Sequence, residues 1–290
     1  MSIINFGSYC IDNVYSVPHF VKPGETLPSI DYQIHPGGKG LNQSLALVYA
    51  GVAVKHAGKV GRDGLWLKDL LSEAGVDTSL TQVIDAPSGH ANIQVTPEGE
   101  NAIVIYGGAN KAIERQDIVD ALADVSPGDY ILVQNETSCL VDMLEIAKEK
   151  QQRVIFNAAP MTAEVNSYPL DLIEFFVINQ VEGEALSDQQ DTQDILDALM
   201  DRFPESKIVL TLGDEGAIYR DATRQISQAA FPADAIDSTG AGDTFTGYFF
   251  AGVIQGLNVE KCLHNACKAA AICVTREGAA SSIPRRAELD

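Results

Sequence analysis

Short apolar, β-branched segments alternate with helical segments along most of this chain, and no other feature constrains its fold as strongly. The segments that read as strands, such as 154–157 and 175–179, are continuously apolar rather than alternating with polar residues. Strands of this kind, separated by helices, form a largely parallel sheet that helices cover on both faces. The sequence therefore predicts an α/β fold, a three-layer sandwich in which ligands bind beyond the carboxyl ends of the strands.

The predicted strands of the large sheet are 3–6, 53–60, 130–134, 154–157, 175–179 and 207–212. The predicted helices are 41–50, 65–74, 114–123, 141–150, 192–203, 241–255 and 259–275. Residues 9–36 and 88–108 break this rhythm, and strand-like alternation on either side of 97–100 predicts a hairpin. We expect these two stretches to form a small β-sheet lid within one domain spanning 1–290. One exposed face of such a lid favours a homodimer.

Charge and cysteine usage limit the partners and the compartment. The chain has 20 basic and 40 acidic residues, a net charge of −20, which argues against a nucleic-acid partner. An anionic substrate would need local attraction from helix N-termini, lysines or a divalent metal. No apolar run is long enough to cross a bilayer, and the N-terminus does not resemble a signal peptide. Five cysteines without a CxxC or zinc spacing indicate the reducing cytoplasm.

The segment 237–245, Asp-Ser-Thr-Gly-Ala-Gly-Asp-Thr-Phe, carries the most chemistry. Gly240 and Gly242 leave backbone N–H groups uncovered where a helix begins, and such a terminus binds phosphate. Asp243 falls in the first helical turn, beside any anion held there. An acid in that place would repel a phosphate, but it can take a proton from a hydroxyl that attacks the phosphorus. Taken alone, the pattern is also typical of an ordinary helix start.

A second glycine cluster, Pro-Gly-Gly-Lys-Gly-Leu-Asn-Gln at 36–43, also opens a helix. Its bare N–H groups, one ammonium and side-chain amides suit a polyhydroxylated ligand, although a glycine-rich turn with a solvated lysine explains it equally well. It is not a Walker A loop. Polar residues follow the predicted strands at Glu136, at Glu182 and at 211–216. Glu182 could reach a hydrated Mg²⁺ or could simply stabilise a helix N-terminus. No dinucleotide fingerprint follows the first strand, which argues against a nicotinamide-dependent oxidoreductase.

Taken together, these motifs resemble the ribokinase-like (PfkB-type) carbohydrate kinase family over nearly the whole length, and most closely its ribokinase branch. The similarity depends on the order and spacing of several short motifs rather than on any one of them. They comprise Gly7-Ser8 with Asp12, 23–26, 37–40 with Asn42-Gln43, Asn179 with Glu182, 211–213, 237–245, and 270–279.

The resemblance implies an ATP-dependent kinase acting on a terminal CH₂OH, with Mg²⁺ and K⁺ as cofactors. It implies that Asp243 is the catalytic base and that Gly240, Ala241 and Gly242 form the anion hole. The matching sugar-binding positions are Asp12, Gly38, Lys39, Asn42 and Glu136. The matching nucleotide-binding positions are Asn179, Thr211, Gly213 and Gly216, and Glu182 is linked to Mg²⁺. The matching monovalent-cation positions are Asp237, Thr239, Cys273, Arg276, Gly278 and Ser282.

One position departs from the family pattern. Ribokinases carry asparagine two residues before the sugar-binding aspartate, and here that residue is Cys10. A thiol cannot replace the paired donor and acceptor of an amide. Ribose or a related pentose is the expected substrate, and a nucleoside, a ketohexose or a modified sugar remains open. So does a sugar-sensing protein on the same scaffold, although Asp243 argues against it.

Overall fold

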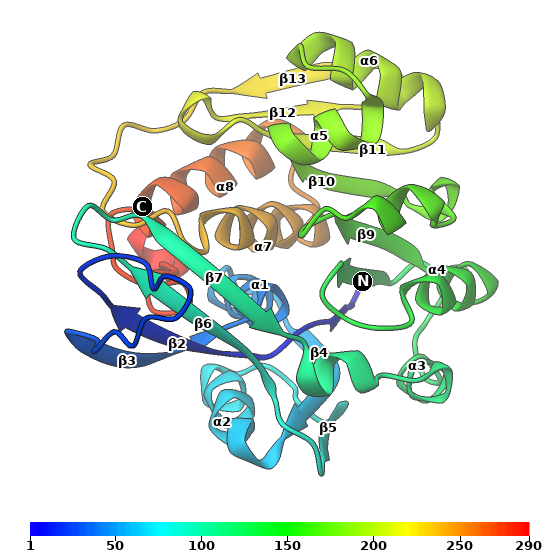
Figure 1. The fold of residues 1–290 in the computed structure, drawn as a ribbon. Helices are drawn as coiled ribbons and strands as arrows, with labels where there is room; N and C mark the ends of the chain where they lie inside the picture. Colours follow the sequence, from blue (N-terminus) through cyan, green and yellow to red (C-terminus); the bar gives the residue numbers. More distant parts are fainter. Residues whose placement is uncertain (290) are drawn as a thin grey trace.

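The computed structural model describes residues 1–289 and contains two sheets (Figure 1). The larger has nine strands in the order β13-β12-β11-β10-β9-β8-β1-β4-β5. Every neighbouring pair from β11 to β5 is parallel, whereas β12 and β13 are antiparallel additions at one edge. The strands are β1 (Ile3–Phe6), β4 (Val54–Gly61), β5 (Thr81–Ile84), β8 (Tyr130–Gln134), β9 (Arg153–Asn157), β10 (Phe175–Asn179), β11 (Lys207–Thr211), β12 (Ala217–Arg220) and β13 (Gln225–Gln228).

Helices cover both faces of this sheet. One layer holds α1 (Lys39–Tyr49), α2 (Leu65–Ala74), α7 (Ala241–Ile254) and α8 (Val259–Cys273). The other holds α3 (Arg115–Ala121), α4 (Leu140–Glu149), α5 (Gln180–Ser187) and α6 (Thr192–Arg202). A separate hydrophobic core lies between each layer and the sheet, so the predicted mostly parallel sandwich is confirmed.

The second sheet is the lid. It has four strands in the order β3-β2-β6-β7, namely β2 (Cys10–Ser16), β3 (Asp31–Gly37), β6 (Gly89–Val95) and β7 (Asn101–Tyr106). The predicted hairpin is β6–β7, which pairs in antiparallel fashion, while β2 and β6 run parallel. Since β2 follows β1 directly and β3 leads into α1, the lid is tied to the centre of the large sheet.

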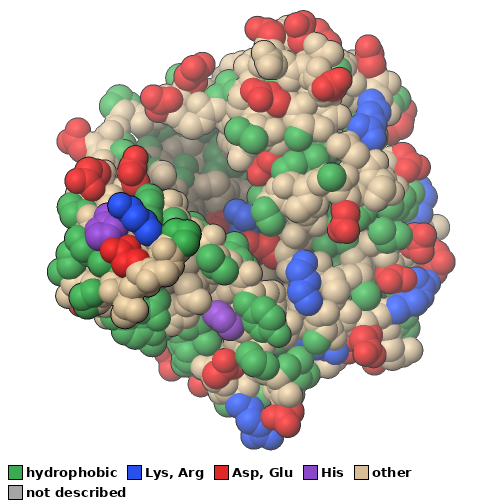
Figure 2. Space-filling view, viewed as in Figure 1, with side chains coloured by type: hydrophobic (Ala, Val, Ile, Leu, Met, Phe, Trp, Pro, Cys, Tyr) green, Lys and Arg blue, Asp and Glu red, His purple; other side chains and the backbone are tan. Residues whose placement is uncertain are grey.

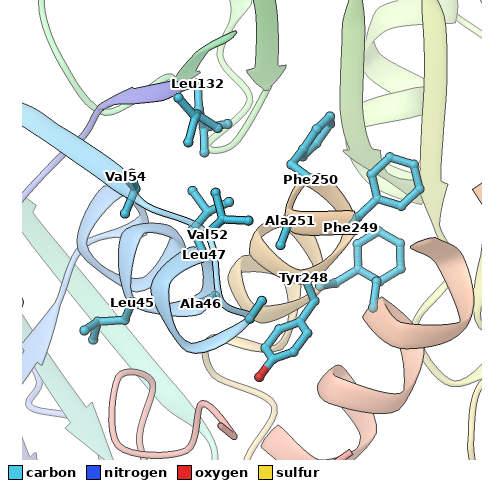
Figure 3. Packing of buried hydrophobic residues seen from close by; sticks show 14 of the residues in the cluster. Leu45, Ala46, Leu47, Val52, Val54, Leu132, Tyr248, Phe249, Phe250 and Ala251 are labelled. Atoms are coloured by element: carbon cyan, nitrogen blue, oxygen red, sulfur yellow. The ribbon is translucent and has the colours of Figure 1, made fainter. Parts of the chain in front are cut away.

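Helices α1 and α7 pack against each other at unusually close range, with bulky neighbours on either side (Figure 3). A Cβ built on Gly247 would lie 2.3 Å from the Cβ of Ala46, so only a glycine allows this approach. Around this contact Leu47, Phe249 and Phe250 fill the core under the sheet. The close approach brings together the N-terminal turns of the two helices, each of which follows a glycine-rich loop.

No helix in residues 1–289 is both long and apolar enough to cross a membrane.

Candidate active site

The carboxyl ends of the parallel strands, the lid and the N-termini of α1 and α7 converge on one region of the molecule. Figure 2 shows the surface hollowed between the lid and the body. A cavity of about 560 Å³ lies beside the N-terminal turn of α7, and Gly242 forms part of its wall. This is the sheet edge where the sequence predicts ligand binding.

Asp243 is held through both oxygens of its carboxylate. Its side chain is buried, and each carboxylate oxygen accepts an amide hydrogen from α1. Asn42 Nδ2 donates to Oδ2 over 2.9 Å, and Gln43 Nε2 donates to Oδ1 over 2.8 Å. Burial raises the pKa of Asp243, while the positive charge of Lys39 and the two amide donors oppose this shift. The result is an oriented carboxylate with a basicity above that of an exposed aspartate, as a general base requires.

The backbone around Asp243 offers an anion site. Gly240, the N-cap of α7, has φ of 79°, in the left-handed region that favours glycine. The first hydrogen bond within the helix runs from Thr244 N to Gly240 O. The N–H groups of Gly242 and Asp243 therefore have no acceptor within the helix. Of the predicted anion-hole residues, Ala241 donates its N–H to the carbonyl of Ser238 over 3.2 Å. The free N–H groups at this terminus therefore begin at Gly242.

Lys39 brings an ammonium into this group of acids. Burial alone would lower the pKa of Lys39, but Asp243, Glu136 and Glu182 together raise it. Glu136 follows β8 and accepts hydrogen bonds from Ser8 Oγ and, over 3.0 Å, from the Lys39 backbone N–H. Gly38 precedes Lys39 with φ of 99°, and a Cβ there would lie 2.8 Å from the Ser8 carbonyl. These contacts hold the start of α1 against the end of β1.

Asp12 and Cys10 face this region from β2 of the lid. Burial and the charge of Glu136 raise the pKa of Asp12 to about 6, while a hydrogen bond from Cys10 and the nearby His35 oppose this shift. Burial and the charges of Asp12 and Glu136 raise the pKa of the Cys10 thiol, which therefore stays protonated. The pair thus presents one strong acceptor and one weak donor.

The cavity beside α7 is mostly apolar. Its walls come from the β11–β12 connection, the segment 230–235 and one side of α8. Three of the predicted nucleotide-binding residues, Thr211, Gly213 and Gly216, lie on it, and Asn179 lies on a neighbouring hollow with Thr211 and Gly213. The apolar residues of 230–235, Phe231 among them, were not predicted, because nothing in their pattern marks a binding wall.

Asn179 and Glu182 form a capping box at the N-terminus of α5. Asn179 N donates to Glu182 Oε2 and Glu182 N donates to Asn179 Oδ1, both over 2.9 Å. Burial raises the pKa of Glu182, with the Asn179 backbone N–H and Lys39 acting in the opposite direction. Because the cap occupies its carboxylate, Glu182 suits a contact to hydrated Mg²⁺ through water, in keeping with the way Mg²⁺ retains its waters.

Asp237 joins two loops next to α7. Its Oδ1 accepts from Thr239 N over 2.9 Å, and its Oδ2 accepts from Gly278 N over 2.9 Å. Cys273 Sγ and Ser282 Oγ lie 3.0 Å apart on the inner side of the second loop, and the Arg276 backbone belongs to its first turn. Within residues 1–289 no cluster of three or more His, Cys, Asp or Glu side chains could hold a metal. A cation here would depend on main-chain carbonyls, which suits K⁺ rather than a transition metal.

The structure therefore brings Asp243, Asn42, Lys39 and Glu136 into one group, with Asp12 facing it from the lid. Gln43, which the sequence analysis did not select as a site residue, is in direct contact with Asp243. Ser8, which was also not selected, joins this group by donating a hydrogen bond from its hydroxyl to Glu136. Gln43 sits beside Asn42 in the glycine-rich motif, and that adjacency was the only signal available.

Comparison with known proteins gives full-length matches. Residues 2–286 match the pfkB family of carbohydrate kinases. A ribokinase of Haemophilus influenzae is 35% identical over 292 residues, covering 97% of this chain and 95% of that protein. A deoxyribokinase of Salmonella typhi is 31% identical over 293 residues, covering 98% and 96%. The structure of Arabidopsis thaliana ribokinase complexed with ribose and ATP matches with a TM-score of 0.86 and 28% identity, covering 99% of this chain and 97% of that one.

Proposed function

This chain belongs to the pfkB family of carbohydrate kinases, and from this premise we propose that it transfers the γ-phosphoryl group of ATP to a terminal hydroxyl of a small sugar, with ribose or a related pentose as the acceptor. The observation that carries this proposal is the place of Asp243. It lies at the α7 N-terminus, next to Gly242 on the cavity wall, and within the group formed by Asn42, Gln43 and Lys39.

In the proposed reaction Asp243 accepts the proton of the sugar hydroxyl as its oxygen bonds to the γ-phosphorus. The bond from that phosphorus to the β–γ bridging oxygen breaks, and ADP leaves. The anion hole at Gly240, Ala241 and Gly242, whose free N–H groups begin at Gly242, and the ammonium of Lys39 stabilise the charge on the transferred group. Asp12, Gly38, Lys39, Asn42 and Glu136 hold the sugar. Asn179, Thr211, Gly213 and Gly216 hold the nucleotide.

Two cations complete the proposal. Glu182 would hold Mg²⁺ through water, and that ion would neutralise charge on the phosphates. Asp237, Thr239, Cys273, Arg276, Gly278 and Ser282 would hold K⁺, mainly through carbonyl oxygens, and so stiffen the loop before α7. The hydrogen bonds that Asp237 accepts from the backbone N–H groups of Thr239 and Gly278 support this, because they already hold the two loops together.

We further propose one kinase domain over 1–290, with residues 9–36 and 88–108 as its lid, working as a cytoplasmic homodimer. Large apolar side chains on the lid support dimerisation, since Val104 and Ile105 are 70% and 65% exposed. Free thiols at all five cysteines support the cytoplasm. Neither nucleic acid nor membrane is expected as a partner of a chain with a net charge of −20.

A second candidate acceptor is a pentose that lacks one hydroxyl. Cys10 favours it, because a protonated thiol beside Asp12 cannot satisfy a buried hydroxyl as an amide can. The similarity to a deoxyribokinase is in line with this candidate.

The test is ADP formation from ATP and Mg²⁺ over a panel of pentoses, deoxypentoses, ketohexoses and nucleosides, with and without K⁺. We expect a pentose or deoxypentose to give the highest kcat/KM, and faster turnover with K⁺. Tight sugar binding with no ADP under any of these conditions would instead identify a sugar-sensing protein.

A further inference from the structure

A chain of buried side-chain amides runs from Asp243 into the large sheet. Gln43 Nε2 donates to Asp243 Oδ1 over 2.8 Å, and Gln134 Nε2 donates to Gln43 Oε1 over 2.7 Å. Gln134 Nε2 also donates to Asn5 Oδ1 over 2.8 Å. Gln43, Gln134 and Asn5 are all 0% exposed.

The chain ends on α1 and β4. Asn5 Nδ2 donates to the Gly40 carbonyl over 2.8 Å and to Ser44 Oγ over 2.9 Å. Ser44 Oγ in turn lies 2.8 Å from His56 Nδ1. Burial lowers the pKa of His56 to about 3, so its ring is neutral at physiological pH. Asp243 is therefore the one charged member of this chain.

These amides stand where a parallel sheet ordinarily has aliphatic side chains. Asn5 and Gln134 occupy adjacent central strands, β1 and β8, which are covered on both faces. Burying an amide costs free energy unless its groups are bonded, and Gln134 Oε1 has no bonded partner within residues 1–289. Valine or leucine at these positions would avoid the burial cost of the amides themselves, so apolar packing alone does not explain them.

The ionised carboxylate of Asp243 determines which way the Gln43 amide points. An ionised carboxylate only accepts hydrogen bonds, so the NH₂ group of Gln43 must face it and the Gln43 carbonyl must face away. The NH₂ group of Gln134 meets that carbonyl and fixes the orientation. A reversed Gln43 would set two acceptor oxygens against each other at Asp243 and two NH₂ donors against each other at Gln134.

We propose that Gln43 is a positioning residue for the base Asp243, and that Gln134 fixes the orientation of the Gln43 amide. This rests on the proposed function, because it takes Asp243 to be the proton acceptor. Asn42 already meets Oδ2 of the carboxylate, so the second amide fixes its rotation as well as its location. The remaining lone pairs of the carboxylate then point in defined directions, and one of them can accept from the sugar hydroxyl.

Four other groups bear on the basicity of Asp243. The ammonium of Lys39 stabilises its ionised form, whereas Glu136 and Glu182 disfavour it, and the Cys273 thiol on α8 is neutral. None of these groups is altered by a substitution at Gln43. Loss of the Gln43 N–H donor should therefore raise the pKa of Asp243 and move the acidic limb of the kcat–pH profile to higher pH.

The test compares Gln43→Met and Gln134→Met with Gln152→Met, each with circular dichroism as a check of folding. Gln152 is a suitable control because it is also buried, 8% exposed, but directly precedes β9 and so lies at the amino-terminal ends of the parallel strands, away from the site. For Gln43→Met we expect kcat to fall about 10- to 100-fold, the value of one hydrogen bond to a charged group. For Gln134→Met a fall of about 3- to 10-fold is expected from a neutral bond. The KM values for sugar and ATP should stay within about 3-fold, and Gln152→Met should match the wild type.

An unchanged kcat and an unshifted pH profile in Gln43→Met would overturn the inference. So would a rise in the sugar KM at constant kcat, which would mean that Gln43 binds sugar. Should Gln43→Met not fold, the isosteric Gln43→Glu replaces it: an acceptor against Asp243 should lower kcat further still, and wild-type kcat would refute positioning. A wild-type enzyme that phosphorylates nothing overturns the proposed function along with this inference. An active wild type, an inactive Asp243→Asn and an unaffected Gln43→Met overturn this inference alone.

Discussion

Gly247 of α7 meets Ala46 of α1 without room for a side chain, since a Cβ on Gly247 would lie 2.3 Å from the Cβ of Ala46. One turn earlier on the same faces, Asp243 meets Asn42 and Gln43. Residues three and four positions apart share a helix face, so the close contact and the polar contact belong to one interface. The distance between the helices therefore sets the geometry of the carboxylate.

Gly247→Ala should lower kcat as well as stability. The added methyl group would force α1 and α7 apart, which costs about 1–3 kcal/mol of unfolding free energy and lengthens both bonds to Asp243. Gly252→Ala is the matched control on the same helix, because its Cβ would meet Cys262 Sγ of α8 at 2.8 Å instead. Both changes gain about 1 kcal/mol of helix propensity. Urea unfolding should show that both variants are less stable than the helix-propensity gain alone would make them. Steady-state kinetics should show a reduced kcat only in Gly247→Ala. Equal kcat in the two variants would contradict the coupling.

Asp243→Asn should abolish most turnover while leaving the fold intact. The amide cannot accept a proton, and its NH₂ group would face the NH₂ group of either Asn42 or Gln43, which donate to different oxygens of Asp243. Loss of general-base catalysis is expected to lower kcat by about 10²–10⁴. Calorimetric titration with ADP should give wild-type affinity, because the carboxylate does not contribute to binding the product nucleotide. Near-normal kcat on the preferred sugar would show that another group is the base.

The periodicity of the sequence predicted most of the large sheet, because buried parallel strands leave continuous apolar runs. β1, β8 and β10 begin and end where predicted. β5, β12, β13 and α5 were missed for physical reasons. The three missed strands have only four residues each, and polar residues such as Arg220 and Gln225 interrupt their apolar pattern. α5 begins directly at the end of β10 and has eight residues, too few for a clear amphipathic pattern.

The candidate site was only partly predictable. Motif residues at strand ends could be placed at one sheet edge by the rule for parallel sheets. The contact between Gln43 and Asp243 could not, because it depends on which faces of two helices, 200 residues apart, pack together. Ala46 and Gly247 carry that information as small residues, but only the structure shows that they face each other.

Sugar use should depend on pH through Asp12. Burial raises its pKa to about 6, and the ionised form is the one that accepts hydrogen bonds from sugar hydroxyls. We expect kcat/KM for the sugar to fall as the pH drops below about 6, and to level off above it. The raised pKa of Asp12 affects the free energy of unfolding with the opposite dependence on pH. A carboxyl whose folded pKa is raised stabilises the protein at low pH, and that contribution is lost as the pH rises through about 6.

Asp12→Asn is the corresponding variant. It should gain about 1–3 kcal/mol of unfolding free energy at pH 8 and lose this advantage near pH 4, while its affinity for sugar falls. Urea unfolding at the two pH values measures the first effect. A variant less stable than the wild type at pH 8 would show that the ionised carboxylate is better solvated or paired than the structure indicates.

Cys10→Asn should shift the choice of sugar toward the acceptor with the additional hydroxyl. Cys10 lies on β2 of the lid, half-buried beside Asp12, where a protonated thiol gives one weak donor. An amide adds a donor and an acceptor of ordinary strength, worth about 3- to 10-fold in discrimination for one neutral hydrogen bond. The measurement is the ratio of kcat/KM for ribose to that for deoxyribose, in the wild type, in Cys10→Asn and in Cys139→Ser, a cysteine at the start of α4. We expect the ratio to rise in Cys10→Asn and to stay constant in Cys139→Ser. A ratio that does not move in Cys10→Asn would mean that the sugar hydroxyls are read by other residues, and that the thiol only fills space beside Asp12.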